Sequence, residues 1–123
     1  MEALEKTCYS QCGGRLIPSR RVGENVDGAD LSILIDALAD DDGIFRSWEQ
    51  AGEVMDLLMT DQMDGNAGLL MFGNRRNVFY SYRGVLIQEC RITWNATSRG
   101  WEKSEPTSEI TALKPGDRIF PRI

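Results

Sequence analysis

The chain has 123 residues, a length that fits one folded domain with a single hydrophobic core. Its 41% hydrophobic and 27% charged residues are typical of a soluble globular protein, and no apolar run approaches the roughly 20 residues that cross a membrane. There is no histidine, which removes the commonest general base and the commonest metal ligand. Because the first residues also lack the apolar segment of a signal peptide, we expect a cytoplasmic protein without a membrane partner.

Formal charge divides the chain into two halves. Residues 1–66 carry 14 acidic and 5 basic side chains, whereas residues 67–123 carry 5 acidic and 9 basic ones. Helical patterns lie mainly in the acidic half and strand patterns mainly in the basic half, with no linker between them. We therefore expect one α+β domain over residues 1–123. Such an asymmetry favours electrostatically steered association.

The N-terminal region predicts a short helix over residues 2–12, followed by a loop over residues 13–27 with a candidate strand at 15–17. Cys8 and Cys12 would lie four residues apart on one face of that helix. A structural zinc site needs four ligands, which three cysteines without histidine do not supply. Cysteines at this helical spacing are also poorly placed for a disulfide, so we expect free thiols and no metal.

Two clearer helices follow, over residues 28–39 and 47–62. The apolar residues of the first recur at i, i+3, i+4 and i+7, as Leu31, Leu34, Ile35 and Leu38. Ser47 and Gln50 match a capping box at the start of the second.

Aspartates 40–42 followed by Gly43 suggest a calcium loop. Aligning this glycine with the invariant one of an EF-hand places Leu38, which cannot be a ligand, at the first coordinating position. The run is better interpreted as the solvated end of a helix, and no metal site is predicted.

The C-terminal half contains short, turn-bounded strand patterns. The strands are expected at residues 69–72, 78–82, 85–94, from 101 onward, at 110–113 and at 118–120. Pro115 and Gly116 predict a type II turn, and Pro121 favours an edge position for the last strand. We expect two or three N-terminal helices packed on one face of a four- to five-stranded antiparallel meander.

Arginine and large aromatic residues gather in this second half. The candidate binding residues are Arg75, Arg76, Tyr80, Arg83, Arg91, Trp94, Arg99 and Trp101. This composition is typical of protein-binding hot spots and of single-strand nucleic-acid platforms, although the net charge of −5 argues against nucleic acid. An ordinary sheet with aromatic residues in its core and arginines paired to nearby glutamates also explains it.

The favoured function is a small binding or interaction protein that self-associates through its sheet as a homodimer. Inhibitors, immunity proteins and accessory proteins of mobile elements share this profile by analogy. One alternative is a small-molecule-binding module or carboxylate-based enzyme with a pocket between helices and sheet, and another is a nucleic-acid adaptor. The sequence has no phosphate-binding loop and no histidine-containing triad, so we assign no catalytic residue and no cofactor.

Overall fold

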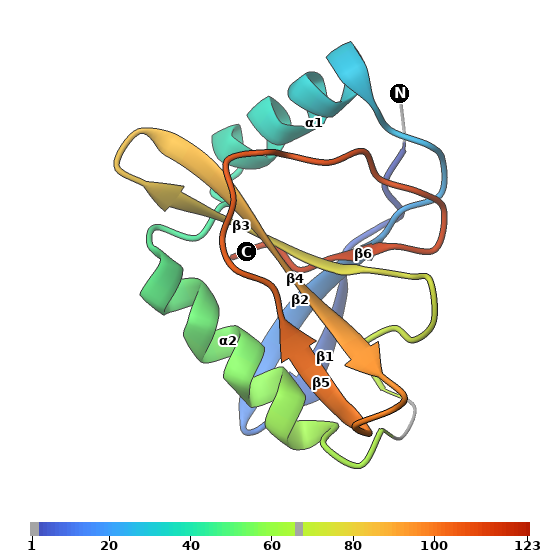
Figure 1. Cartoon of the computed structure of the whole chain (residues 1–123). Helices are drawn as coiled ribbons and strands as arrows, with labels where there is room; N and C mark the ends of the chain where they lie inside the picture. Colours follow the sequence, from blue (N-terminus) through green and yellow to red (C-terminus); the bar gives the residue numbers. More distant parts are fainter. Residues whose placement is uncertain (1–2, 66–67) are drawn as a thin grey trace.

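The computed structural model describes residues 3–65 and 68–123, which form two helices and one curled six-stranded sheet (Figure 1). The helices are α1 (Gly28–Asp40) and α2 (Trp48–Asp61). The strands are β1 (Cys8–Cys12), β2 (Arg15–Arg21), β3 (Asn77–Arg83), β4 (Leu86–Asn95), β5 (Gly100–Lys103) and β6 (Arg118–Ile119). The α+β class is confirmed. Neither helix of the described chain is long and apolar enough to cross a membrane.

The sheet has the order β1-β2-β6-β3-β4-β5. Every neighbouring pair is antiparallel except β3 and β6, which run parallel. The expected four- to five-stranded antiparallel meander is therefore wrong in strand number and in direction. The short strand β6 lies centrally and not at an edge. Pro121 lies two residues beyond its last residue, Ile119, so the missing N–H removes no hydrogen bond from the sheet.

The helix expected over residues 2–12 is absent from the described residues 3–12, where β1 pairs with β2 in an antiparallel hairpin, and residue 2 lies outside the described residues. β2 extends the candidate strand at 15–17. Gly13 and Gly14 have φ values of +56° and +80°, as a two-residue type I′ turn requires. A glycine pair serves a helix end or a hairpin turn equally well. Here the turn prevails because it brings β1 under α2, where Cys12 is buried.

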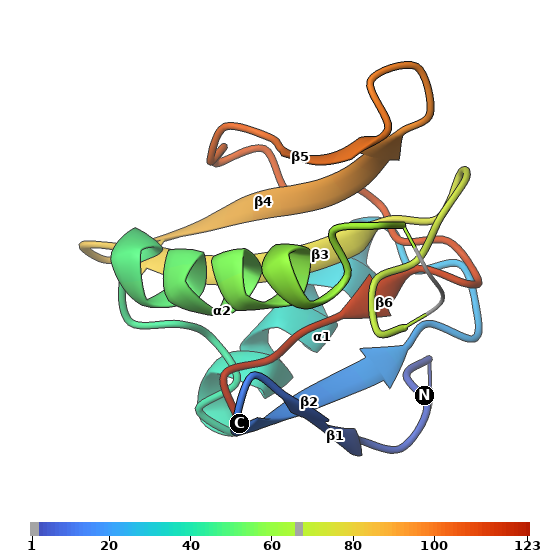
Figure 2. The same ribbon diagram turned by 90° about the horizontal axis from the view of Figure 1, so that it is seen from below.

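The two helices pack on opposite faces of β3, and not on one face as expected (Figure 1). Successive strand residues point to opposite sides. Val78 and Tyr80 join the core beneath α1, whereas Phe79 joins the core beneath α2. The hairpins β1–β2 and β4–β5 form the two outer edges of the curled sheet (Figure 2).

Both long helices are confirmed to within a residue or two of the predicted ends. Ser47 caps α2, since its Oγ accepts the Gln50 N–H at 3.1 Å. The glutamine side chain in turn accepts the Arg46 N–H at 2.9 Å, one residue before the usual capping-box donor. These bonds hold the chain that enters α2.

Residues 69–72 and 110–113 do not form the expected strands. The Leu70 backbone bonds instead to the side-chain amide of Gln62, at 2.8 and 3.1 Å. Residues 110–113 make one isolated bridge, at Leu113. An apolar run predicts burial, but here hydrogen bonds to side chains take the place of a strand partner.

Candidate functional site

The eight predicted binding residues do not share one surface. Arg83 ends β3, whereas Arg99 follows β4, a strand of ten residues. A strand of this length separates the two side chains by roughly 30 Å. Arg75 lies just before β3 and is exposed, with its side chain beside Gly116 in the turn that precedes β6. The eight residues belong to separate neighbourhoods with different roles.

Arg76 lies in a buried ion pair with Asp117, which is only 1% exposed. The guanidinium Nη2 and Nε lie 3.0 and 3.2 Å from Oδ2 of the aspartate. The same carboxylate accepts the backbone N–H groups of Arg76 and Lys114, at 2.9 and 3.0 Å. The pair therefore fastens the turn before β6 to the start of β3, and Arg76 serves the fold.

Arg91 faces a second buried carboxylate, that of Glu89, which has no exposed surface. Its Nε lies 3.6 Å from Oε2 of the glutamate. The Thr111 hydroxyl donates to this carboxylate, at 3.0 and 3.2 Å from its two oxygens, and the Thr111 N–H lies 3.3 Å from Oε1. The glutamate thus holds the segment before β6 against the sheet. Arg91 approaches the same carboxylate from the partly exposed side.

Tyr80 lies in the core opposite Glu89 in the β3–β4 register. Its hydroxyl is buried and makes no hydrogen bond within the described chain. Burial, which disfavours the phenolate, raises the pKa of Tyr80 well above its usual range, and the nearby charge of Glu89 raises it further. Tyr80 is therefore not available to a partner in this structure.

Replacing Tyr80 by phenylalanine should raise the free energy of unfolding by about 1 kcal/mol, because a buried hydroxyl without a partner is removed. Urea unfolding at neutral pH measures this. The gain should grow above about pH 10, where the unfolded tyrosine ionises and the folded one keeps its proton, so that only the wild type loses stability through this group. A less stable variant would contradict the prediction.

Trp94 and Trp101 form an aromatic cluster with Phe72, with ring centroids 4.8 to 5.5 Å apart. The Trp101 Nε1–H donates to the Gln62 carbonyl at 2.7 Å. A Cβ added to Gly65 would lie 2.6 Å from the Trp94 ring, so the chain passes closely over it. The cluster holds the end of α2 against β4 and β5. An open hollow of ≈ 370 Å³ lies beside the cluster and is lined in part by Phe72 and Trp94.

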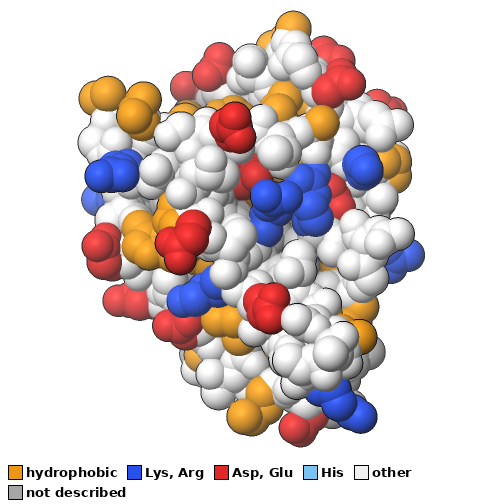
Figure 3. All heavy atoms as spheres, viewed as in Figure 1, with side chains coloured by type: hydrophobic (Ala, Val, Ile, Leu, Met, Phe, Trp, Pro, Cys, Tyr) orange, Lys and Arg blue, Asp and Glu red, His pale blue; other side chains and the backbone are white. Residues whose placement is uncertain are grey.

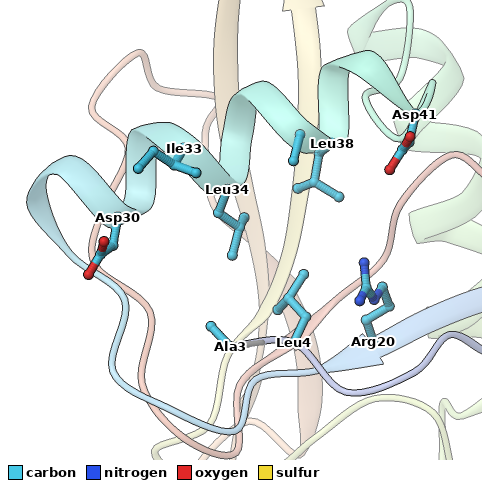
Figure 4. Close-up of a pocket in the computed structure, with 9 residues that line it drawn as sticks. Ala3, Leu4, Arg20, Asp30, Ile33, Leu34, Leu38 and Asp41 are labelled. Carbon is cyan, nitrogen blue, oxygen red and sulfur yellow. The ribbon is translucent and has the colours of Figure 1, made fainter. Parts of the chain in front are cut away.

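A groove of ≈ 330 Å³ lies between α1 and the N-terminal segment (Figure 4). Its apolar lining comes mainly from Ala3, Leu4, Ile33, Leu34 and Leu38, with Asp30, Asp41 and Arg20 around it. None of the eight predicted residues lines this groove.

A larger cavity of ≈ 540 Å³, here called the α2 cavity, lies at the start of α2. Residues 46–49, the end of β3, Gln88 of β4 and residues 105–106 line it. The Phe45 N–H donates to the Tyr80 carbonyl at 3.0 Å, which fixes the start of α2 against β3. Of the predicted residues, only Arg83 lines this cavity.

The sequence analysis missed the other polar groups of the α2 cavity. Gln88 is 8% exposed and lines the cavity, and its side-chain amide makes no hydrogen bond to the described chain. A single glutamine in a strand has no pattern that reveals such a position. The capping box at Ser47 was the one available signal, because it marks a helix start with unpaired N–H groups.

Opposite charges are interspersed on the face shown in Figure 3 and do not gather into an acidic and a basic region. The asymmetry along the sequence is therefore not reproduced on this face. Cys8 is exposed and Cys12 and Cys90 are buried, all as free thiols. Among the described residues, no three acidic or cysteine side chains are placed to hold a metal ion.

Comparisons with models of known protein families, with curated proteins and with solved structures found no match for this chain.

Proposed function

We propose that this chain is a small cytoplasmic binding protein that self-associates through the open edge of β1. This strand is one outer edge of the sheet (Figure 2). Exposed edge strands usually carry lysine, proline or another feature that prevents pairing with other chains. β1 has the sequence CYSQC, without charge or proline, whereas the other edge, β5, carries Glu102 and Lys103. This unprotected edge is the observation that carries the proposal.

The hairpin geometry determines which backbone groups of β1 face outward. A two-residue turn makes Cys12 and Arg15 a hydrogen-bonded pair, and such pairs alternate along antiparallel strands. Tyr9 and Gln11 therefore direct their N–H and C=O groups away from β2. Neither residue bonds through its backbone elsewhere in the described chain. Four backbone groups are thus available at this edge.

A second copy of β1 satisfies all four groups. A twofold axis through Ser10 places Tyr9 opposite Gln11 of the copy, and each such pair exchanges two backbone hydrogen bonds. Tyr9 and Leu16, which are 57% and 56% exposed, would join their counterparts on one face of the extended sheet. Four bonds of about 1 kcal/mol each correspond to a Kd of roughly 1 mM, so we expect a weak dimer.

Sedimentation equilibrium from about 10 μM to about 1 mM should show a monomer–dimer equilibrium. Gln11→Pro should abolish the dimer, since it removes an outward N–H without removing a hydrogen bond to β2. Glu102→Ala on the other edge is the control and should leave the dimer unchanged. A chain that is monomeric throughout, or a dimer indifferent to Gln11→Pro, would refute the proposal.

Cross-linking tests the register directly. In a Cys8→Ser background, Ser10→Cys should give a disulfide-linked dimer under mild oxidation, because residues at the twofold axis have Cα atoms about 4.5 Å apart. Gln11→Cys is the matched control on the same edge. Its counterpart lies diagonally across the pair, about 7–8 Å away, and should cross-link poorly. Equal cross-linking at both positions would indicate a different register.

The nucleic-acid and carboxylate-enzyme hypotheses remain predictions with less support. Arg76, Arg91 and Tyr80, which the first hypothesis used, have contacts inside the fold. The buried carboxylate of Glu89 is bonded to Thr111. Self-association needs none of these groups to be released.

A further inference from the structure

We propose that the α2 cavity binds a small zwitterion of the α-amino-acid type, with its carboxylate at the start of α2. The cavity is lined by α2, the β3–β4 hairpin and residues 105–106, and does not involve β1. The site is therefore independent of self-association.

The start of α2 offers two free backbone N–H groups, those of Trp48 and Glu49. The Gln50 N–H bonds to the Ser47 hydroxyl, and the Ala51 N–H bonds to the Ser47 carbonyl at 3.2 Å. The N–H groups of Trp48 and Glu49 precede these and make no hydrogen bond within the described chain. Free N–H groups and the positive end of the helix dipole favour a bound carboxylate.

Gln88 is a second and independent sign of a ligand. It is 8% exposed and lines the cavity, and its side-chain amide makes no hydrogen bond to the described chain. Its amide atoms are not among the fully buried ones that lack a partner, so they reach the open space of the cavity and are accessible to a ligand there. Gln88 shares the face of β4 that bears Cys90 and Ile92, which pack beneath α2. Its amide both donates and accepts, so it can serve a carboxylate and an ammonium group.

The charges around the cavity select a zwitterion over a simple anion. Arg46 and Arg83 have no carboxylate within 4.0 Å in the described chain, and Glu49 and Glu105 have no basic partner. Two arginines attract a phosphate, but two glutamates repel it, whereas a ligand with both charges complements both pairs. The Trp48 ring supplies an apolar wall for a side chain. A volume of ≈ 540 Å³ suits a small molecule.

The test is a titration of the ¹⁵N-labelled protein followed by NMR, with four probes. L-leucine carries both charges, 4-methylpentanoate only the carboxylate, 3-methylbutylamine only the ammonium, and inorganic phosphate is a pure anion. L-leucine should shift the signals of the Trp48 and Glu49 amides and the Gln88 side-chain amide. Each singly charged analogue should bind about tenfold more weakly, since one charged hydrogen-bonding group is lost.

Variants show whether binding occurs in this cavity. Arg83→Gln, at an exposed position, should weaken L-leucine binding about tenfold, and Gln88→Leu should weaken it similarly. Arg99→Gln, also exposed and at the far end of β4, is the matched control and should have no effect. The proposal is overturned if no probe shifts these signals at about 50 mM, if phosphate binds more tightly than L-leucine, or if Arg83→Gln changes nothing.

Discussion

Replacing Asp117 by alanine is expected to lower the free energy of unfolding by about 3–5 kcal/mol. The carboxylate is 1% exposed and accepts hydrogen bonds from the Arg76 guanidinium and from the backbone N–H groups of Arg76 and Lys114. Its removal leaves a guanidinium whose side chain is only 15% exposed without an ionic partner. A typical domain is stable by about 5–15 kcal/mol, so the loss is a large part of the total.

Urea unfolding followed by circular dichroism measures this loss. Asp117→Asn keeps the shape and one acceptor oxygen, so its loss should lie between those of the wild type and the alanine variant. Glu109→Ala, at an exposed residue outside the network, should change stability by no more than about 0.5 kcal/mol. A loss below about 1 kcal/mol for Asp117→Ala would show that the ion pair contributes little beyond its solvation cost.

Local signals predicted the helices well. The positions of α1 and α2 follow from apolar periodicity and from the capping residues Ser47 and Gln50, which act within a few residues of one another. The hairpin of β1 and β2 was missed because Gly13-Gly14 suits either a helix end or a turn. What decides between them is burial of Cys12 beneath α2, a contact with a distant part of the chain.

The sheet topology depends on contacts between distant segments. Val78 pairs with Ile119 in the parallel β3–β6 ladder, and two residues of β6 give no local pattern that indicates this. The sequence did contain a signal that the two helices cover opposite faces of β3. The run from Val78 to Tyr80 is continuously apolar, which is typical of a strand buried on both faces and so of cover on both sides.

Composition located the arginines of the candidate site but not their roles. Arg76 pairs with Asp117, 41 residues later in the chain, and Arg91 pairs with Glu89 two residues before it on the same strand. Neither contact follows from a count of basic residues. Arg83 is the predicted residue that reaches the α2 cavity, because it ends β3 where the hairpin meets α2.

Replacing Glu89 by alanine is expected to lower the free energy of unfolding by about 2–4 kcal/mol. The substitution removes the acceptor of the Thr111 hydroxyl and N–H, and it opens a gap at a site with no exposed surface. The same hydroxyl accepts the Arg76 Nη1–H at 2.6 Å, so the loss extends to the Asp117 ion pair. The two carboxylates therefore stabilise one connected network, and the double variant should lose less than the sum of the single losses.

Amide hydrogen exchange separates the side chain of Glu89 from its backbone. The Thr107 N–H bonds to the Glu89 carbonyl, which alanine keeps, whereas the Thr111 N–H bonds to the carboxylate, which alanine lacks. Under native conditions Glu89→Ala should therefore speed exchange at Thr111 much more than at Thr107. Equal acceleration at both would mean that the whole segment detaches from β4, and its attachment would then depend on more than this one carboxylate.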